Sequence, residues 1–373
     1  MQLLRLVAGQ VRVGQPLPFG VRDEHGKLLL AQGQIVASDA QLEVLLKRGA
    51  TVDIEEVRAA MQRHAAAKSQ RPLTLFGQWE HELWELDRTL RSHAEPGFVE
   101  RLDALIARVV ALTERDPDIA IYLSVRQDPK RLTIYPLAHA IHCAKVGLLM
   151  ARRLGWDEPR TTTFLRAALT MNIATLELQG RLAAQGVGPT PDQLVELRAH
   201  PAKGVEMLRA AGVADEAWLE AVQRHHERPD GSGFPEGVPE AGELPTALRL
   251  LDVFMAKMAP RALRAPLPPQ LAARQLFQED GGGPVSSAII KEFGIYPPGE
   301  FVQLKSGEQA VVVRRGATAN TPLAAAVTDK AGMPSVNTPI RDTAKPEFAI
   351  ASLLRDQVLV LRVPPERLYG LPE

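Results

Sequence analysis

Five of the nine histidines lie in the middle third of the chain, where they could form a metal site. His139 and His142 are three residues apart, His200 follows, and His225 and His226 are adjacent. Imidazole is the commonest metal ligand in proteins. Three imidazoles are a common ligand set where a catalytic metal keeps an open position. His200, His225 and His226 could therefore supply three nitrogen atoms to one divalent ion.

Asp252 is a candidate charged partner for these histidines. Leu248 and Met255 flank it at helical spacing, so its carboxylate is expected on the core-facing side of a helix. A buried carboxylate needs a partner or a metal ion. Buried histidines also occur as hydrogen-bonded core residues, which is our interpretation of His142. A histidine pair near a helix end can instead interact with the negative end of the helix dipole, so spacing leaves both possibilities open.

The elements that would position these residues are predicted to be helices. Residues 137–154 are apolar almost all round, which is typical of a buried helix. Thr190, Pro191 and Gln193 form a helix start with a capping box. This helix is expected to end before Pro201, because the residue before a proline avoids helical geometry. His200 would then lie at a joint between helices.

Two further helices are predicted around the histidine pair. One begins near Asp215 and ends at His225 and His226. The other begins at Pro245 and carries Asp252. Between them lies a glycine- and proline-rich loop over 228–239, in which the backbone can approach a ligand closely.

The whole chain divides by pattern into four predicted parts. Residues 1–57 form a small α+β N-terminal module, and 58–97 form a helical linker. Residues 98–293 keep a helical period throughout. Residues 294–373 form a small β-rich C-terminal module, in which 301–304 and 309–313 read as a hairpin and 358–363 as a strand. The predicted protein is multidomain, with a central all-α domain flanked by small β-rich modules.

Composition limits the classes of partner. The 373 residues include 44 Lys and Arg and 44 Asp and Glu, so the formal net charge is zero. This balance argues against binding of a nucleic-acid polymer, which needs a cationic surface, but it permits a local pocket for a small anion. Cys143 is the single cysteine, so no disulfide can form within the chain, and a cytoplasmic location is expected. No secretory signal and no membrane span are expected either.

The loop sequence resembles a known signature. The eleven residues from His225 to Pro235, HHERPDGSGFP, closely resemble the HHExxDGxGYP signature of HD-GYP domains, with Phe234 in place of tyrosine. HD-GYP domains are helical, metal-dependent phosphodiesterases that hydrolyse the bacterial second messenger cyclic di-GMP. The resemblance covers about residues 98–293. It implies that His200, His225 and His226 bind one metal ion, and that His139 and Asp252 belong to a second metal position.

The resemblance also implies a set of substrate-binding residues. Basic residues of the family that hold substrate phosphates correspond to Arg261 and Arg264. The signature loop implies a ligand-binding role for four further residues, which are Gly231, Gly233, Phe234 and Pro235.

Three substitutions separate this chain from the family pattern. The HD-x-G-K stretch of the family is expected after residue 169, where the chain has Met171 for the histidine ligand, Asn172 for the metal-bridging aspartate and Thr175 for the lysine. A two-metal phosphodiesterase holds its ions about 3.5–4 Å apart. Asn172 is neutral and cannot offset two dications, and the thioether of Met171 suits hard divalent ions poorly. The resemblance therefore implies that catalytic residues are lacking at these positions.

These departures predict a catalytically impaired or inactive signalling protein. It would act as a cyclic di-GMP receptor or as a protein-interaction module, for example with GGDEF-domain proteins. The expected cofactor is none, or one divalent ion such as zinc, manganese or iron. The alternative is a metal-dependent phosphodiesterase with residual single-metal activity. A structural remnant that binds neither metal nor nucleotide is a third possibility.

Overall fold

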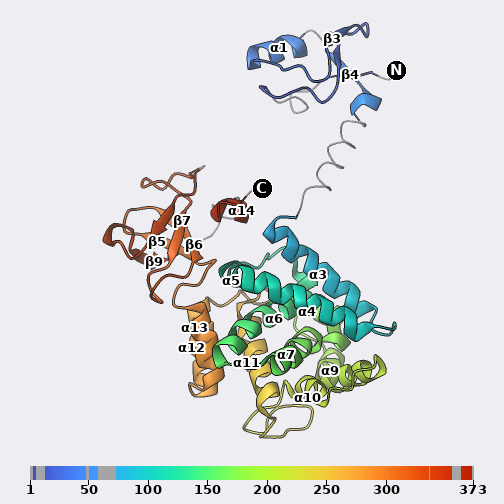
Figure 1. Cartoon of the computed structure of the whole chain (residues 1–373), viewed down its shortest axis with the longest axis vertical. Coiled ribbons are helices and arrows are strands. Elements are labelled where there is room, and N and C mark those ends of the chain that lie inside the picture. The colour runs from blue at the N-terminus through green and yellow to red at the C-terminus, as the bar shows by residue number, and fades with distance from the viewer. Residues whose placement is uncertain are drawn as a thin grey trace. The chain divides into compact units, whose positions relative to one another are not determined.

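The computed structural model describes residues 3–5, 13–47, 50–57, 73–335, 337–354 and 363–371. Contacts divide the chain into two compact units, Met1–Leu73 and Thr74–Glu373 (Figure 1). The predicted fold class is confirmed: a helical body forms most of the second unit, and small antiparallel sheets lie toward both ends of the sequence. The four-part division of the chain stays a prediction, and residues 58–72 of the predicted linker lie outside the described residues.

In the described residues, the N-terminal unit contains a four-stranded antiparallel sheet and helix α1 (Asp39–Lys47). Its strands run in the order β1 (Leu3–Arg5), β4 (Thr51–Asp53), β2 (Val21–Arg22) and β3 (Leu28–Leu30). Helix α1 precedes β4. A separate small core holds this unit together, with members such as Leu17, Phe19, Val36 and Val52.

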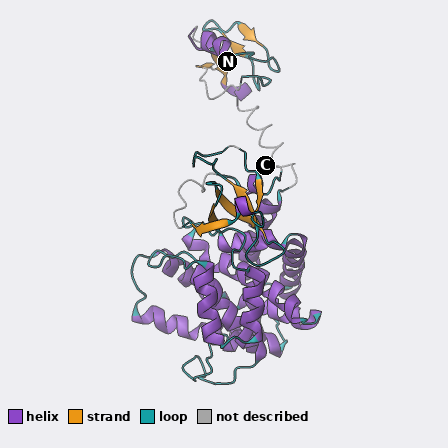
Figure 2. Ribbon diagram, turned by 90° about the vertical axis from the view of Figure 1, so that its left-hand side faces the viewer, coloured by secondary structure: helices purple, strands orange, loops and turns teal. Residues whose placement is uncertain are grey.

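Helices make up the body of the second unit, as Figures 1 and 2 show. In chain order the α-helices are α3 (Leu75–Arg91), α4 (Phe98–Arg115), α5 (Pro117–Val125), α6 (Tyr135–Leu154), α7 (Glu158–Thr170), α8 (Leu176–Ala184), α9 (Pro191–Ala210), α10 (Glu216–Arg224), α11 (Glu243–Met258), α12 (Pro269–Asp280) and α13 (Pro284–Phe293). One apolar core runs through them, with Leu86, Leu105, Val146, Phe164 and Phe254 among its fully buried members.

Helix α6 lies at the centre of this core and is buried on nearly all sides, as its apolar sequence predicts. It packs against α7, α11 and α13. A Cβ atom on Gly147 would come within 2.5 Å of the Phe164 ring, so glycine allows α6 and α7 to approach closely. The segment Leu132–Leu154 has the length and hydropathy of a membrane span, but 83% of that window is buried inside the protein. A helix buried in a protein core meets the same criterion of length and hydropathy.

The prediction that this helix ends before Pro201 is wrong. Helix α9 continues through Pro201 to Ala210. A proline inside a helix removes the hydrogen bond to the carbonyl four residues earlier, here that of Leu197. The Leu197 carbonyl accepts a hydrogen bond from the His200 ring instead. His200 therefore lies within a continuous helix and not at a joint.

A five-stranded antiparallel sheet follows the helices. Its strand order is β8 (Ile340–Asp342), β7 (Leu323–Ala326), β6 (Gln309–Arg314), β5 (Phe301–Leu304) and β9 (Ile350–Leu353). The β5–β6 hairpin matches the predicted one, whereas the predicted strand at 358–363 lies almost entirely outside the described residues. Val311 and Val313 of β6 join the helical core. Arg314 pairs with Asp116 at 2.5 Å, which fastens the sheet to the start of α5.

Helix α6 also buries a lysine. The Lys145 side chain is 1% exposed, and its Nζ lies 4.8 Å from the centroid of the Trp79 ring on α3. Among the described residues, no carboxylate pairs with this ammonium. Burial lowers the pKa of Lys145 from 10.5 to about 7. The charged form of this side chain is therefore costly in the folded protein.

Replacing Lys145 with Met is expected to change how stability depends on pH. Between pH 7 and about 10.5 the unfolded chain holds a proton on Lys145 that the folded chain does not, so the free energy of unfolding of the wild type rises with pH in this window. The rise relative to Lys145→Met amounts to several kcal/mol at most, at about 1.4 kcal/mol per pKa unit. Urea unfolding of both proteins at pH 6.5 and pH 9 measures it. Parallel pH dependence in the two proteins would contradict a lowered pKa.

Candidate metal centre

Three histidine rings converge in the helical body. His200 lies on α9, and His225 and His226 follow the last turn of α10. The Nε2 atoms of His200 and His225 are 3.2 Å apart. One ligand atom from each of the three rings can be chosen so that all lie within 4.8 Å of one another.

The hydrogen bonds of His200 and His225 fix which nitrogen atoms face each other. His200 donates its Nδ1 hydrogen to the Leu197 carbonyl at 2.5 Å, and His225 donates its Nδ1 hydrogen to the Val222 carbonyl at 2.7 Å. A carbonyl can only accept, so each Nδ1 carries the hydrogen. In a neutral ring the Nε2 atom is then a lone-pair acceptor. Backbone carbonyls orient metal-binding imidazoles in the same way.

Burial keeps these rings neutral. It lowers the pKa of His200 to about 4, with a further contribution from His225. Burial also lowers the pKa of His225, and holds that of His226 well below the usual value. At neutral pH two lone pairs therefore face each other across 3.2 Å. A cation between them satisfies both, and nitrogen ligands at 2.0–2.1 Å around a tetrahedral zinc lie about 3.4 Å apart. The three residues thus fit a single divalent ion.

The proline of α9 contributes to this geometry. The carbonyl of Leu197 has no backbone donor at position 201, because Pro201 lacks an N–H. This leaves the carbonyl free to hold the His200 ring. His200 and Pro201 therefore act together: the proline frees the acceptor that fixes the tautomer of the preceding histidine.

The glycine-rich loop is held in place by Glu227. Its buried carboxylate accepts hydrogen bonds from the backbone N–H groups of Glu236, Gly237 and Val238, at 2.7, 3.1 and 3.0 Å. A Cβ atom on Gly233 would lie 2.5 Å from the Cα atom of Glu227, so only glycine fits.

Gly231 has a φ of +72°, which glycine adopts without strain. The folded loop stacks Phe234 on the His226 ring, with centroids 4.6 Å apart. Pro235, which follows Phe234, does not line the adjoining pocket among the described residues.

The side chains on the other side of the site, around His139 and Asn172, are hydrogen-bonded to other residues of the protein. His139 of α6 and Asp252 of α11 form a hydrogen bond, with 2.7 Å between Nε2 and Oδ1. Asn172, just after α7, accepts a hydrogen bond on Oδ1 from Gln179 of α8 at 2.6 Å. Gln179 also lies 3.2 Å from the Thr175 hydroxyl. An ion that used His139, Asp252 or the Asn172 oxygen would have to compete with these contacts.

The carboxylate of Asp252 stays ionised in this setting. Burial by itself raises the pKa of Asp252, but the hydrogen bond with His139 and the nearby imidazoles of His225 and His226 outweigh burial, so the pKa lies below its usual value. Met171 is fully buried beside Asn172. Asp252 therefore supplies the negative charge on the His139 side, and neither Met171 nor Asn172 adds to it.

The two predicted phosphate-binding arginines differ in their relation to the site, although their backbones are hydrogen-bonded to each other. A pocket of about 230 Å³ brings together six of the predicted site residues, which are Asn172, His200, His226, Phe234, Asp252 and Arg261. The rest of its lining comprises Tyr135, Gln179, Leu182, Ala183, Leu197 and Ala256. Arg261 donates to the Tyr135 hydroxyl at 2.5 Å, and its buried Nε contacts no acceptor in the described part of the chain. Arg264 is exposed, bonds the Ala256 carbonyl and does not line this pocket.

Two contributors were missed by sequence reasoning. Gln179 lies seven residues after Asn172 and four after Thr175, a helical spacing that places all three on one side of the chain. That spacing could have identified it. The exposed Arg198 of α9 lies with its Cζ 5.9 Å from the centroid of the Phe234 ring, and no sequence signal indicated this contact.

Replacing Glu227 with Gln is expected to destabilise the loop. The amide keeps one acceptor oxygen and points an N–H₂ group at backbone donors, so the free energy of unfolding should fall by about 2–4 kcal/mol. Glu240→Gln, which changes an exposed acid in the same connection between α10 and α11, is the matched control and should leave stability within about 0.5 kcal/mol. Urea unfolding of the three proteins measures both values. Equal stability of Glu227→Gln and wild type would show that the three bonds do not hold the loop.

Comparisons with known proteins agree with the geometry of the site. The HD domain family matches residues 127–281. A cyclic di-GMP phosphodiesterase of Pseudomonas aeruginosa is 26% identical over 186 residues, which is 48% of this chain and 45% of that protein. A cyclic di-GMP phosphodiesterase of Thermotoga maritima is 28% identical over 147 residues, which is 38% of this chain and 40% of that protein. The chain thus spans less than half the length of these relatives.

A solved structure is also similar. Bd1817, an HDG"Y"P protein from Bdellovibrio bacteriovorus, covers 77% of this chain and 98% of its own, at 15% identity and a TM-score of 0.46. The match to the HD domain family spans the helices that bring His139, His200, His225 and Asp252 together, and the HHE and DGxG elements lie between α10 and α11. The helical region of this chain is therefore similar to HD domains and to bacterial cyclic di-GMP phosphodiesterases.

Proposed function

We propose that this protein is a cyclic di-GMP signalling protein that binds one divalent ion through His200, His225 and His226 and does not hydrolyse the dinucleotide efficiently. The observation that supports this most directly is the contrast between the two halves of the site. Two unprotonated Nε2 atoms face each other on one side. On the other side His139 is bonded to Asp252, and Asn172 to Gln179.

The bound ion would supply Lewis acidity that polarises a phosphate oxygen. The protein residues would bind and orient the dinucleotide. Arg261 has an unsatisfied donor at the pocket wall and can form a charge-assisted bond to phosphate. The aromatic ring of Phe234 lines the pocket, and one face of this ring is stacked on His226. Thr175 brings no positive charge to stabilise phosphoryl oxygens.

The alternative function, a phosphodiesterase with residual single-metal activity, is supported by the intact histidine triad. One ion can still activate water. However, neutral Asn172 cannot offset a second dication, and the site offers no cation at position 175. The balance of charge therefore favours binding over turnover. A protein partner, such as a GGDEF-domain protein, would bind the form of the protein that holds cyclic di-GMP.

The metal content should be one ion per chain. His225→Ala removes one of the two facing Nε2 atoms and should abolish retention of zinc or manganese after gel filtration, measured by inductively coupled plasma mass spectrometry. His139→Gln is the matched control, because its amide can keep a hydrogen bond to Asp252, and it should retain the ion. Loss of metal in His139→Gln with retention in His225→Ala would place the ion on the opposite side of the site.

Cyclic di-GMP binding should depend on Arg261 and not on Arg264. Removing one charge-assisted bond costs about 1.5–3 kcal/mol, so calorimetry of Arg261→Ala should show affinity weakened by about 10- to 100-fold. Arg264→Ala should bind as wild type does, because this side chain lies outside the pocket. An equal loss in both variants would mean that these arginines act together at a surface. Absence of binding to the wild type would contradict the receptor function.

Hydrolysis should be absent or very slow in the wild type with manganese or with iron supplied anaerobically. Restoring the family residues in Met171→His with Asn172→Asp should raise turnover, because a second set of ligands and a bridging charge become available. Chromatography of the linear products measures the rate. Fast turnover by the wild type that is lost in His225→Ala would show that a single-ion site is sufficient for catalysis.

A further inference from the structure

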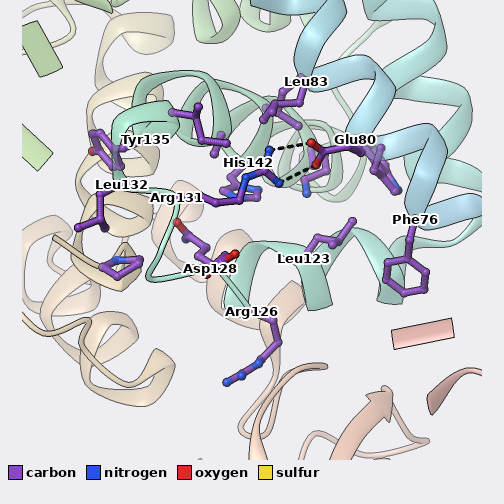
Figure 3. A pocket seen from close by; sticks show the side chains of 17 residues that line it. Phe76, Glu80, Leu83, Leu123, Arg126, Asp128, Arg131, Leu132, Tyr135 and His142 are labelled. Carbon is purple, nitrogen blue, oxygen red and sulfur yellow. Dashed lines mark hydrogen bonds and ion pairs between the residues drawn. The ribbon is translucent and has the colours of Figure 1, made fainter. Parts of the chain in front are cut away.

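A second pocket, of about 180 Å³, lies beside a different face of α6 from the one that carries His139. From α6 the lining includes Ala138, Ile141, His142 and Lys145, which share one helical face. Helices α3 and α5 and the segment before α6 supply the remaining walls (Figure 3). The family signature assigns no role to this pocket.

The walls are largely apolar. Phe76, Trp79 and Leu83 of α3 face Leu123 of α5 and Ile141 of α6 across the pocket. An apolar cavity of about 150 Å³ is large enough to bind benzene. The pocket therefore has the size and lining to hold one ring-sized apolar group.

Lys145 is a buried charged group of this lining that lacks a counter-charge among the described residues. Its side chain is almost completely buried and contacts the Trp79 ring, but among the described residues it forms no ion pair with a carboxylate. His142 is one turn away on α6, and its Nδ1 lies 3.4 Å from the Ser124 hydroxyl. Burial holds the pKa of His142 well below the usual value, so the ring is neutral and does not balance the charge of Lys145. A buried ammonium without a partner destabilises the fold. An acidic ligand would supply the missing partner.

Two of the charges at the pocket mouth, Glu80 and Arg131, are paired with each other. Figure 3 shows the Glu80 carboxylate meeting the Arg131 guanidinium, with distances of 2.6 and 2.8 Å. Asp128 is exposed, and Arg126 lies with its Cζ 4.3 Å from the centroid of the Phe301 ring. Glu80 is therefore already committed to Arg131 and does not compensate Lys145.

We propose that this pocket binds a small organic monoanion with a ring-sized apolar body, such as an aryl carboxylate. The carboxylate would bond the Lys145 Nζ, and the ring would pack between Phe76, Leu83 and Ile141. This binding requires neither the metal ion nor cyclic di-GMP, so it stands or falls independently of the proposed function.

The test uses 4-fluorobenzoate as the probe and the full chain as the receptor. Fluorine NMR at pH 6.5, with EDTA present to prevent binding of carboxylate to metal, measures the dissociation constant. The wild type should show saturable binding, and Lys145→Met should weaken it at least tenfold. Neutral 4-fluorotoluene should bind both proteins equally, because it uses only the apolar walls.

Two further variants keep the result interpretable. Lys291→Met removes an exposed lysine from α13 and should bind 4-fluorobenzoate as the wild type does. Leu123→Phe fills the pocket while leaving Lys145 in place, and should weaken both probes. The proposal is overturned by non-saturable binding to the wild type, by equal affinity in Lys145→Met, or by unchanged binding of both probes in Leu123→Phe.

Discussion

Two neutral imidazoles that face each other with unprotonated nitrogen atoms are the constraint on which the site depends. His200 and His225 each give their Nδ1 hydrogen to a backbone carbonyl, and their Nε2 atoms lie 3.2 Å apart. Burial prevents either ring from taking up a second proton at neutral pH. A divalent ion would relieve the repulsion between the lone pairs. The continuous helix through Pro201 and the end of α10 serve to create this arrangement.

The rest of the site surrounds these histidines. Glu227 uses three backbone hydrogen bonds to shape the loop that stacks Phe234 on His226. The opposite side of the pocket satisfies its polar groups within the protein, through the His139–Asp252 and Asn172–Gln179 pairs. A buried polar group that is already hydrogen-bonded gains little from a ligand and loses its present bond. The two sides therefore differ in what they can bind.

Sequence patterns predicted the parts of this structure that depend on local chemistry. Apolar periodicity predicted buried α6, the Thr190 capping box predicted the start of α9, and the loop motif identified the histidines. The end of α9 was predicted wrongly, because the rule for residues before proline ignores the His200 side chain that compensates the lost bond. Arg261 and Arg264 were both predicted to bind phosphate because the family resemblance places basic residues at these positions, yet of the two only Arg261 lines the pocket. Contacts such as that of Arg198 with Phe234 join separate elements, so neither segment carries a sequence pattern that predicts them.

X-ray absorption spectroscopy of the zinc-loaded protein tests the single-ion centre most directly. We predict a first shell of nitrogen or oxygen atoms at about 2.0–2.1 Å, with outer-shell scattering from three imidazoles. No metal–metal scattering should be present at about 3.5–4 Å, the separation in two-metal phosphodiesterases. A clear metal–metal peak at that distance would contradict the account, because it would require ligands from His139, Asp252 or Asn172 that are bonded within the protein.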